Sequence, residues 1–178
     1  MDFLPTPLPG CHVIEPRVFA DDRGCFFETY HAEKFRGAGL ELPFVQDNHS
    51  HSRRNVVRGL HYQVRRPQGK LVRVVQGEIF DVAVDLRPTS PTLGQWFGIR
   101  LSAERRNQLY LPPGMAHGFC VLSETADVVY KCTDLYLPED ERTILWNDAE
   151  LGIAWPLSGP PIVSARDARA GSFRDAQR

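Results

Sequence analysis

The stretch KLVRVVQGEIFDVAVDLR, residues 70–87, carries the strongest β pattern in the chain. It is rich in valine, and Gln76-Gly77 interrupts it. After the interruption two sets of side chains alternate, as in a strand with two different faces: Phe80, Val82, Val84 and Leu86 against Ile79, Asp81, Ala83 and Asp85. The stretch predicts two consecutive strands that form a hairpin around Gln76-Gly77.

Similar short runs lie on both sides of this stretch. We expect strands at residues 95–102, 107–112, 117–123 and 126–136, and extended segments at 10–20 and 23–30 joined by a turn over 21–24. A short helix is expected over His31–Arg36, and the tail from Ala165 onward is polar and weakly patterned. No repeat or linker divides the chain. The pattern predicts a mostly β sandwich or barrel, a single domain over residues 1–178.

The composition is that of an ordinary globular protein, with 42% hydrophobic and 24% charged residues. A net charge of −1 gives no reason to expect a nucleic acid or an anionic membrane as partner. There is no long apolar run, and the first ten residues do not resemble a secretory leader. Four scattered cysteines form no C-x-x-C pair, so we expect packing roles in a reducing compartment. A cytoplasmic protein is predicted.

The segment VVRGLHYQ, residues 56–63, places a Gly and a His inside an apolar strand. A lone His in such a strand is more often a hydrogen-bonded core residue than a catalyst. Gly59, however, indicates a bulge or a close approach by a ligand or another backbone. In regular alternation Arg58 faces away from His61, and the two share a face only if a bulge at Gly59 turns Arg58 inward.

The segment LPPGMAHGF, residues 111–119, brings His117 onto a strand after a tight turn, as the second motif of many cupins does. Cupins often bind a metal there with a His-x-His pair and a Glu from the first motif. Here the strand reads His61-Tyr62-Gln63, so the second His is missing, and His49-Ser50-His51 lacks the flanking Gly and Glu. A three-His or two-His-carboxylate site remains an alternative, but the pattern predicts no metal.

Lys70 and Tyr130 are two further candidates for chemistry. A Lys at the start of a strand is usually solvated, but beside a developing negative oxygen it would stabilise an enolate or a phosphate. A Tyr with apolar neighbours is by default a buried ring, but at the edge of a core its phenol can act as a general acid. Neither residue is specific by itself.

In their order along the chain, these segments resemble the dTDP-4-dehydrorhamnose 3,5-epimerases and related dTDP-4-keto-6-deoxyhexose epimerases. The resemblance runs from about residue 13 to about residue 167, and RGLHYQ, GKLVR and YKCT are its most specific parts. It includes DDRGCFFETY, FVQDNHSHS, VVRGLHYQ, QGKLVRVVQGEIFDVAVDLRPTSPTLGQW, LYLPPGMAHGF, ADVVYKCTDLY and ILWNDAELGIAWP.

The resemblance implies a cupin-type double-stranded β-helix jelly roll with short peripheral helices. It implies epimerisation of C3 and C5 of dTDP-4-dehydro-6-deoxy-D-glucose, giving dTDP-4-dehydro-L-rhamnose through an enolate. The C4 ketone itself makes the protons on C3 and C5 acidic, so no cofactor is expected. The family forms homodimers that exchange amino-terminal strands.

Carried over residue by residue, the resemblance makes His61 the base, Tyr130 the opposing acid and Asp167 the carboxylate that orients His61. It places Arg58 and Lys70 near the oxygens of the substrate, with His117 nearby. Seven further positions would line the nucleotide-sugar site, and the first two of them would reach it from the partner chain: Arg23, Glu28, Gln46, Asp47, Asn48, Glu141 and Arg166.

Three alternatives are compatible with the sequence. The first is an enzyme that inverts a single carbon, or a related ketoisomerase, in a secondary-metabolite pathway. The chain departs from the family pattern in a loop before Lys70 that is about one residue short, in Arg142 in place of Gly, and in Arg166 in place of Lys. A metal-dependent cupin oxygenase is the second alternative. A non-catalytic sugar-nucleotide binding module is the third, although binding alone does not need His61, Asp167 and Tyr130 together.

Overall fold

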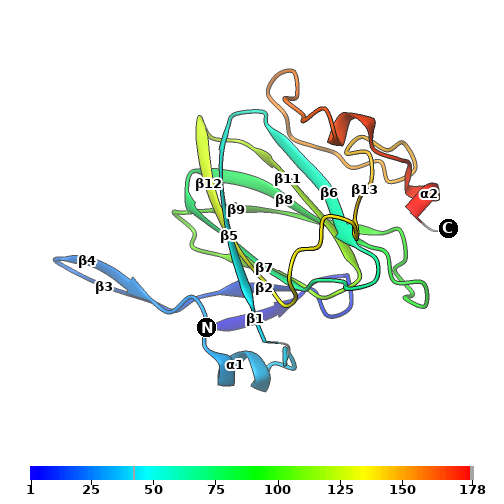
Figure 1. Cartoon of the computed structure of the whole chain (residues 1–178). Coiled ribbons are helices and arrows are strands. Elements are labelled where there is room, and N and C mark those ends of the chain that lie inside the picture. The colour runs from blue at the N-terminus through cyan, green and yellow to red at the C-terminus, as the bar shows by residue number, and fades with distance from the viewer. Residues whose placement is uncertain (42, 177–178) are drawn as a thin grey trace.

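The computed structural model describes residues 1–41 and 43–176. Two antiparallel sheets face each other (Figure 1). The six-stranded sheet has the order β1 (Asp2–Pro5), β2 (His12–Glu15), β10 (Gln108–Leu111), β7 (Lys70–Gln76), β12 (Thr125–Cys132) and β5 (Gln46–Arg53). The five-stranded sheet has the order β13 (Glu141–Thr143), β6 (Val57–Gln63), β11 (Met115–Val121), β8 (Glu78–Asp85) and β9 (Trp96–Ser102).

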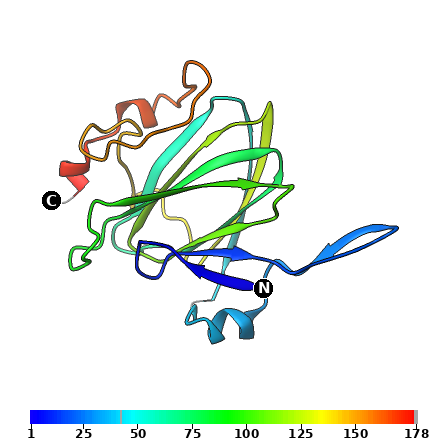
Figure 2. The same cartoon turned by 180° about the vertical axis from the view of Figure 1, so that it is seen from behind.

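The remaining elements are short and peripheral. Strands β3 (Val18–Asp21) and β4 (Gly24–Phe27) pair only with each other, and their hairpin extends away from the two sheets in both views (Figures 1 and 2). The helices are α1 (Ala32–Gly37), α2 (Phe173–Ala176) and a 3-10 turn at Asp167–Arg169. No helix among the described residues is both long enough and apolar enough to cross a membrane. The predicted mostly β class with short peripheral helices is confirmed.

The predicted hairpin over residues 70–87 is wrong. Both strands exist, but β7 lies in the six-stranded sheet and β8 in the five-stranded sheet. At the break, Gly77 has a φ of +79°, and a Cβ there would lie 2.1 Å from the carbonyl oxygen of Thr125. Only glycine fits this corner, which turns the chain from one sheet to the other. Side-chain alternation identifies the two faces of a strand and does not specify its partner.

Strands were predicted correctly where apolar residues alternate and missed where they do not. The segments expected at 95–102 and 107–112 contain β9 and β10, those at 117–123 and 126–136 overlap β11 and β12, and the turn at 21–24 joins β3 to β4. Three strands were not expected: β1, β5 and β13. In β5 the sequence QDNHSHSR is polar on both faces, because its inner side chains line a polar cavity rather than the core.

The main core lies between the sheets and includes Val72, Ile79, Ala83 and Leu109, all with negligible exposure. A second apolar cluster covers the outer face of the five-stranded sheet, where Leu60 and Val82 pack beneath the carboxyl-terminal segment. In Figure 1 this segment, orange to red, runs along that side of the molecule. The covering segment matters for the site because it carries Asp167.

Candidate active site

A cavity of about 320 Å³ opens between the two sheets, next to the core residues Phe119 and Tyr130. Nine of the residues singled out in the sequence line it: Gln46, Asn48, Arg58, His61, Lys70, His117, Tyr130, Glu141 and Arg166. They come from β5, β6, β7, β11, β12, β13 and the carboxyl-terminal segment. The fold therefore gathers in one cavity side chains that are up to 120 positions apart in the sequence (Gln46 and Arg166).

A bulge in β6 brings Arg58 and His61 to the same cavity. The register with β11 pairs His61 with His117 and Arg58 with Phe119, so two residues of β6 stand opposite Gly118. Gly59 has a φ of +108°, and a Cβ on it would lie 2.5 Å from the carbonyl oxygen of His117. The glycine thus permits both the bulge and the close approach of the two strands.

His61 is held by a buried carboxylate. Its Nε2 lies 2.9 Å from Oδ1 of Asp167, and the backbone N–H of Gly59 donates to the other oxygen at 3.3 Å. Burial raises the pKa of the Asp167 carboxyl, but the hydrogen bond from His61 and its charge outweigh burial, so the pKa lies below its usual value. An ionised Asp167 requires the proton on Nε2, which leaves Nδ1 of a neutral His61 free to accept a proton.

A second His–Asp pair lies beside the first. Nε2 of His117 is 2.8 Å from Oδ1 of Asp81, whose side chain is fully buried on β8. Asp81 was not predicted as a site residue, although the sequence carried a signal. It occupies the same face as Ile79 and Ala83, which belong to the core, and a carboxylate among inward-facing apolar residues needs a buried partner.

Lys70 and Tyr130 approach the cavity from the six-stranded sheet. The Lys70 Nζ lies 5.9 Å from the centre of the Tyr130 ring. Burial lowers the pKa of the Lys70 ammonium group and raises the pKa of the Tyr130 phenol. At neutral pH the phenol therefore keeps its proton. His61 belongs to the opposite sheet, so a ligand in the cavity has an imidazole on one side and a phenol with an ammonium group on the other.

Tyr136, Glu141 and Arg166 form a polar group at the more exposed part of the cavity. The Tyr136 hydroxyl donates to Oε2 of Glu141 at 2.8 Å, and Arg166 forms an ion pair with the same carboxylate. Tyr136, Gln68 and Ser50 also line the cavity and were not predicted. Ser50 follows the alternation of Gln46 and Asn48, whereas Tyr136 and Gln68 lie in loops that have no periodic signal.

Four predicted site residues do not line the cavity of this chain: Asp167, which lies buried against His61, and Arg23, Glu28 and Asp47. Arg23 and Glu28 lie on the projecting hairpin and just after it, where they bond to Asp21 and Lys34. Asp47 is exposed on the outer face of β5 and forms an ion pair with Lys131 at 2.9 Å. A contribution of these residues to a substrate site of this chain stays a prediction.

His49 and His51 also point outward from β5. Nε2 of His49 lies 2.8 Å from Oδ1 of Asp127, and Nδ1 of His51 lies 3.0 Å from Oδ2 of the same carboxylate. Across residues 1–41 and 43–176, no group of three or more His, Cys, Asp or Glu side chains is arranged to hold a metal ion. The His-x-His spacing is therefore separate from the cavity.

Comparison with known proteins gives consistent matches over nearly the whole chain. Residues 5–175 match the family model for dTDP-4-dehydrorhamnose 3,5-epimerase. The enzyme of that name from Pseudomonas aeruginosa is 58% identical, over 95% of this chain and 94% of the relative. A solved 3,5-epimerase from Legionella pneumophila, in complex with dTDP-4-keto-L-rhamnose, is 47% identical with a TM-score of 0.95, covering 97% of this chain and 93% of that one.

A solved 3'-monoepimerase from Streptomyces bikiniensis, in complex with dTDP-quinovose, is also similar. It is 36% identical with a TM-score of 0.91, covering 97% of this chain and 88% of that one. These similarities confirm the predicted cupin-type jelly roll. They also indicate that one fold holds epimerases that differ in the number of carbons they invert.

Proposed function

The chain belongs to the dTDP-4-dehydrorhamnose 3,5-epimerase family, and we propose that it inverts C3 and C5 of dTDP-4-dehydro-6-deoxy-D-glucose to give dTDP-4-dehydro-L-rhamnose. As a member of this family it is a carbohydrate epimerase, and the predicted family is confirmed. One observation carries the mechanism: His61, which is held by Asp167, and Tyr130 enter one cavity from opposite sheets.

The reaction begins with a proton that is acidic only because a ketone is adjacent. Removal of a proton from C3 or C5 gives a carbanion that delocalises onto the C4 oxygen as an enolate. Nδ1 of His61 takes the proton, and Asp167 stabilises the imidazolium that forms. The charge of Lys70 stabilises the enolate oxygen, and Arg58 supplies a second positive charge at the cavity.

Inversion requires that the proton return to the opposite face of the carbon. Tyr130 fits this role because its phenol stays protonated at neutral pH and comes from the sheet that faces His61. In every step a proton moves between the substrate and a side chain of this chain. We therefore propose that the reaction needs no cofactor and no metal.

We also propose that the protein forms a homodimer with exchanged amino-terminal strands. The β3–β4 hairpin exposes Phe19 and Phe26, which stand opposite each other in its register and are 53% and 72% exposed. Large apolar side chains on a projecting hairpin are typical of a surface that a partner covers. Phe26→Asp should convert a dimer measured by light scattering into a monomer. A wild-type protein that is monomeric at micromolar concentration would refute the proposal. A cytoplasmic location stays a prediction.

The test of the function is turnover of dTDP-4-dehydro-6-deoxy-D-glucose in deuterated water. A double epimerase places deuterium at both C3 and C5 of its product. A single-carbon epimerase, such as the similar 3'-monoepimerase, would label and invert one carbon only. Product that carries no label at either carbon would exclude the enolate mechanism.

A further inference from the structure

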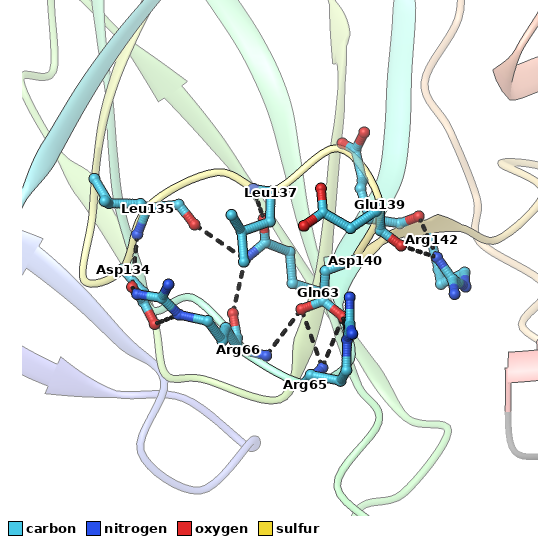
Figure 3. A network of polar contacts seen from close by, with 10 residues as sticks. Gln63, Arg65, Arg66, Asp134, Leu135, Leu137, Glu139, Asp140 and Arg142 are labelled. Carbon is cyan, nitrogen blue, oxygen red and sulfur yellow. Dashed lines mark hydrogen bonds and ion pairs between the residues drawn. The ribbon is translucent and has the colours of Figure 1, made fainter.

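Two loops form one side of the cavity. Residues 64–69 connect β6 to β7, and residues 133–140 connect β12 to β13. They contribute Gln68 and Tyr136 to the cavity, and Glu141 follows directly after the second loop. Neither loop contains a helix or strand, and a few backbone hydrogen bonds join them, among them those from Val64 to Asp140 and from Thr133 to Gly69. Side chains that bond to the loop backbones supply the other connections. Gln63 and Asp140 are two side chains that bond to the loop backbones in this way, and we call this pair the clasp (Figure 3).

Gln63 is the last residue of β6, and it is only 5% exposed. Its amide nitrogen donates to the carbonyl oxygen of Arg66 at 2.7 Å and to that of Leu135 at 3.2 Å. Its amide oxygen accepts from the backbone N–H of Leu137 at 2.8 Å. One side chain therefore bonds to the backbones of both loops.

Asp140 is 1% exposed and makes the complementary connection. Its carboxylate accepts from the backbone N–H groups of Arg65 and Arg66 at 2.9–3.1 Å, and from Nε of Arg65 at 3.1 Å. Burial raises the pKa of the Asp140 carboxyl, but these hydrogen bonds outweigh burial and the pKa lies below its usual value. The group therefore stays ionised at neutral pH, as an acceptor for the loop that precedes Lys70.

Further contacts extend the connection to cavity-lining residues. Gln68 donates through Nε2 to the carbonyl oxygen of Asp134 at 2.7 Å. The backbone N–H of Tyr136 donates to Oε1 of Gln46 at 2.8 Å. In the register of β13 with β6, Glu141 stands opposite Gln63 itself. The clasp thus bonds to the two neighbours of Tyr136, stands next to Glu141 in sequence and register, and holds the loop that carries Gln68.

The clasp is close to the binding surface, and its side-chain hydrogen bonds go to loop residues and not to His61, Lys70 or Tyr130. His61, Lys70 and Tyr130 belong to strands, whose positions the two sheets fix. The loop side of the cavity carries an aromatic ring, amides, a carboxylate and, through Glu141, the cation of Arg166. Such a mixture suits a nucleoside diphosphate better than it suits proton transfer at carbon.

We propose that Gln63 and Asp140 are positioning residues that shape the binding site for the nucleoside diphosphate half of the substrate. The inference rests on the proposed function, and it identifies which part of the ligand the clasp serves. Loss of the clasp should weaken nucleotide binding while the chemical step continues, because uniform binding energy affects KM and not kcat.

The test compares Asp140→Asn and Gln63→Glu with Asp134→Asn. Asp140→Asn keeps the shape of the side chain but replaces one acceptor oxygen, and Gln63→Glu keeps the acceptor for Leu137 but loses both amide donors. Asp134→Asn is the control, since that half-buried carboxylate pairs with the side chain of Arg66 and accepts a backbone N–H only from the next residue, Leu135, whereas the clasp bonds to backbone groups of both loops. dTDP affinity is measured by calorimetry, KM and kcat by turnover, and folding by thermal unfolding.

Each clasp variant should raise the Kd for dTDP and the KM about tenfold, with kcat within about twofold of the wild type. Asp134→Asn should leave all three values near those of the wild type. A folded clasp variant with unchanged Kd and KM, or one that loses kcat alone, would overturn the proposal. A wild type that binds dTDP but turns over no 4-keto sugar would refute the proposed function, whereas the dTDP affinities would still decide the role of the clasp.

Hydrogen exchange of the wild type provides a measurement that does not depend on the folding of a variant. The amides of Arg65, Arg66 and Leu137 should exchange slowly for loop residues, and dTDP should slow them further. If bound dTDP left their exchange unchanged, the clasp would not serve the nucleotide.

Discussion

His61 and His117 are register partners on the paired strands β6 and β11, and each ring bonds through Nε2 to a carboxylate of its own. The two pairs differ in access. The His61 side chain is 28% exposed, whereas that of His117 is 7% exposed. A base must reach the substrate carbon, so the more accessible ring is the better candidate for proton transfer. His117 lines the same cavity, and its contact with the substrate stays a prediction.

Replacement of His61 by Ala should abolish nearly all turnover and leave dTDP binding intact. General-base catalysis contributes about 10²–10⁴-fold, and no other imidazole of the cavity is equally accessible. Steady-state kinetics and calorimetry on the same preparation measure both properties. His49→Ala, an exposed His on the outer face of β5, is the matched control and should keep its activity. More than about a tenth of the wild-type rate in the His61 variant would exclude His61 as the only base.

Tyr130→Phe should separate removal of the proton from its return. The ring keeps its packing, but the acid is lost, so exchange of substrate protons with solvent should outlast formation of the epimerised product. Deuterium uptake by the recovered substrate, compared with product formation, measures the two events. Tyr62→Phe is the control, because Tyr62 lies on β6 and packs in the apolar cluster on the outer face of the five-stranded sheet. A Tyr130 variant that forms product at the normal rate would show that its ring has a packing role only.

Lys70→Met should stabilise the fold while it impairs the reaction. Burial lowers the pKa of Lys70, so its charged form costs folding free energy at neutral pH. A hydrophobic side chain of similar length removes this cost, with a gain of roughly 1–2 kcal/mol. The cost is complete below the folded pKa and decreases as the pH rises toward the unfolded value of about 10.4.

Denaturant unfolding at several pH values measures this effect. The stability difference between Lys70→Met and the wild type should therefore shrink in alkaline solution. Lys131→Met, on the outer face of the six-stranded sheet, should not stabilise the protein. A destabilised Lys70 variant at pH 7 would contradict the inferred cost of the buried charge.

Asp85 and Asp21 allow a matched comparison of one motif in two environments. Each carboxylate accepts hydrogen bonds from the Arg two residues later, Arg87 or Arg23, but the Asp85 side chain is fully buried and that of Asp21 is 53% exposed. Asp85→Asn should lower the free energy of unfolding by about 3 kcal/mol. Asp21→Asn should change it far less, because exposed ion pairs contribute little.

The same pair gives a pH test. Burial raises the pKa of Asp85, but its hydrogen bonds outweigh burial and the folded pKa lies below the usual value. Its contribution is therefore complete above the unfolded pKa of about 3.9 and is lost as the pH falls through the folded pKa. The stability difference between wild type and Asp85→Asn should be constant above about pH 5 and shrink in stronger acid. A difference that grows in acid would reverse this assignment.

The sequence by itself determined the faces of the strands and the chemical types of the catalytic candidates. Alternation in residues 78–85 separated Ile79, Ala83 and Asp81 from Phe80 and Val82, and the structure places these sets on the inner and outer sides of one sheet. This information is local, because successive side chains of a strand point to opposite faces whatever its partner is. The motif RGLHYQ likewise identified His61 and Gly59, two residues before it.

Only the tertiary structure decided which segments meet. It placed β7 and β8 in different sheets and turned Arg58 inward through the bulge at Gly59. The contact of Asp167 with His61 across 106 residues is also tertiary, and before the structure only the family resemblance implied it. The tertiary structure also joined Gln63 to Leu135 and Leu137 in a loop that has no periodic pattern. Strand partners and loop contacts depend on the packing of the whole chain. The alternation of side chains along a single strand does not specify that packing.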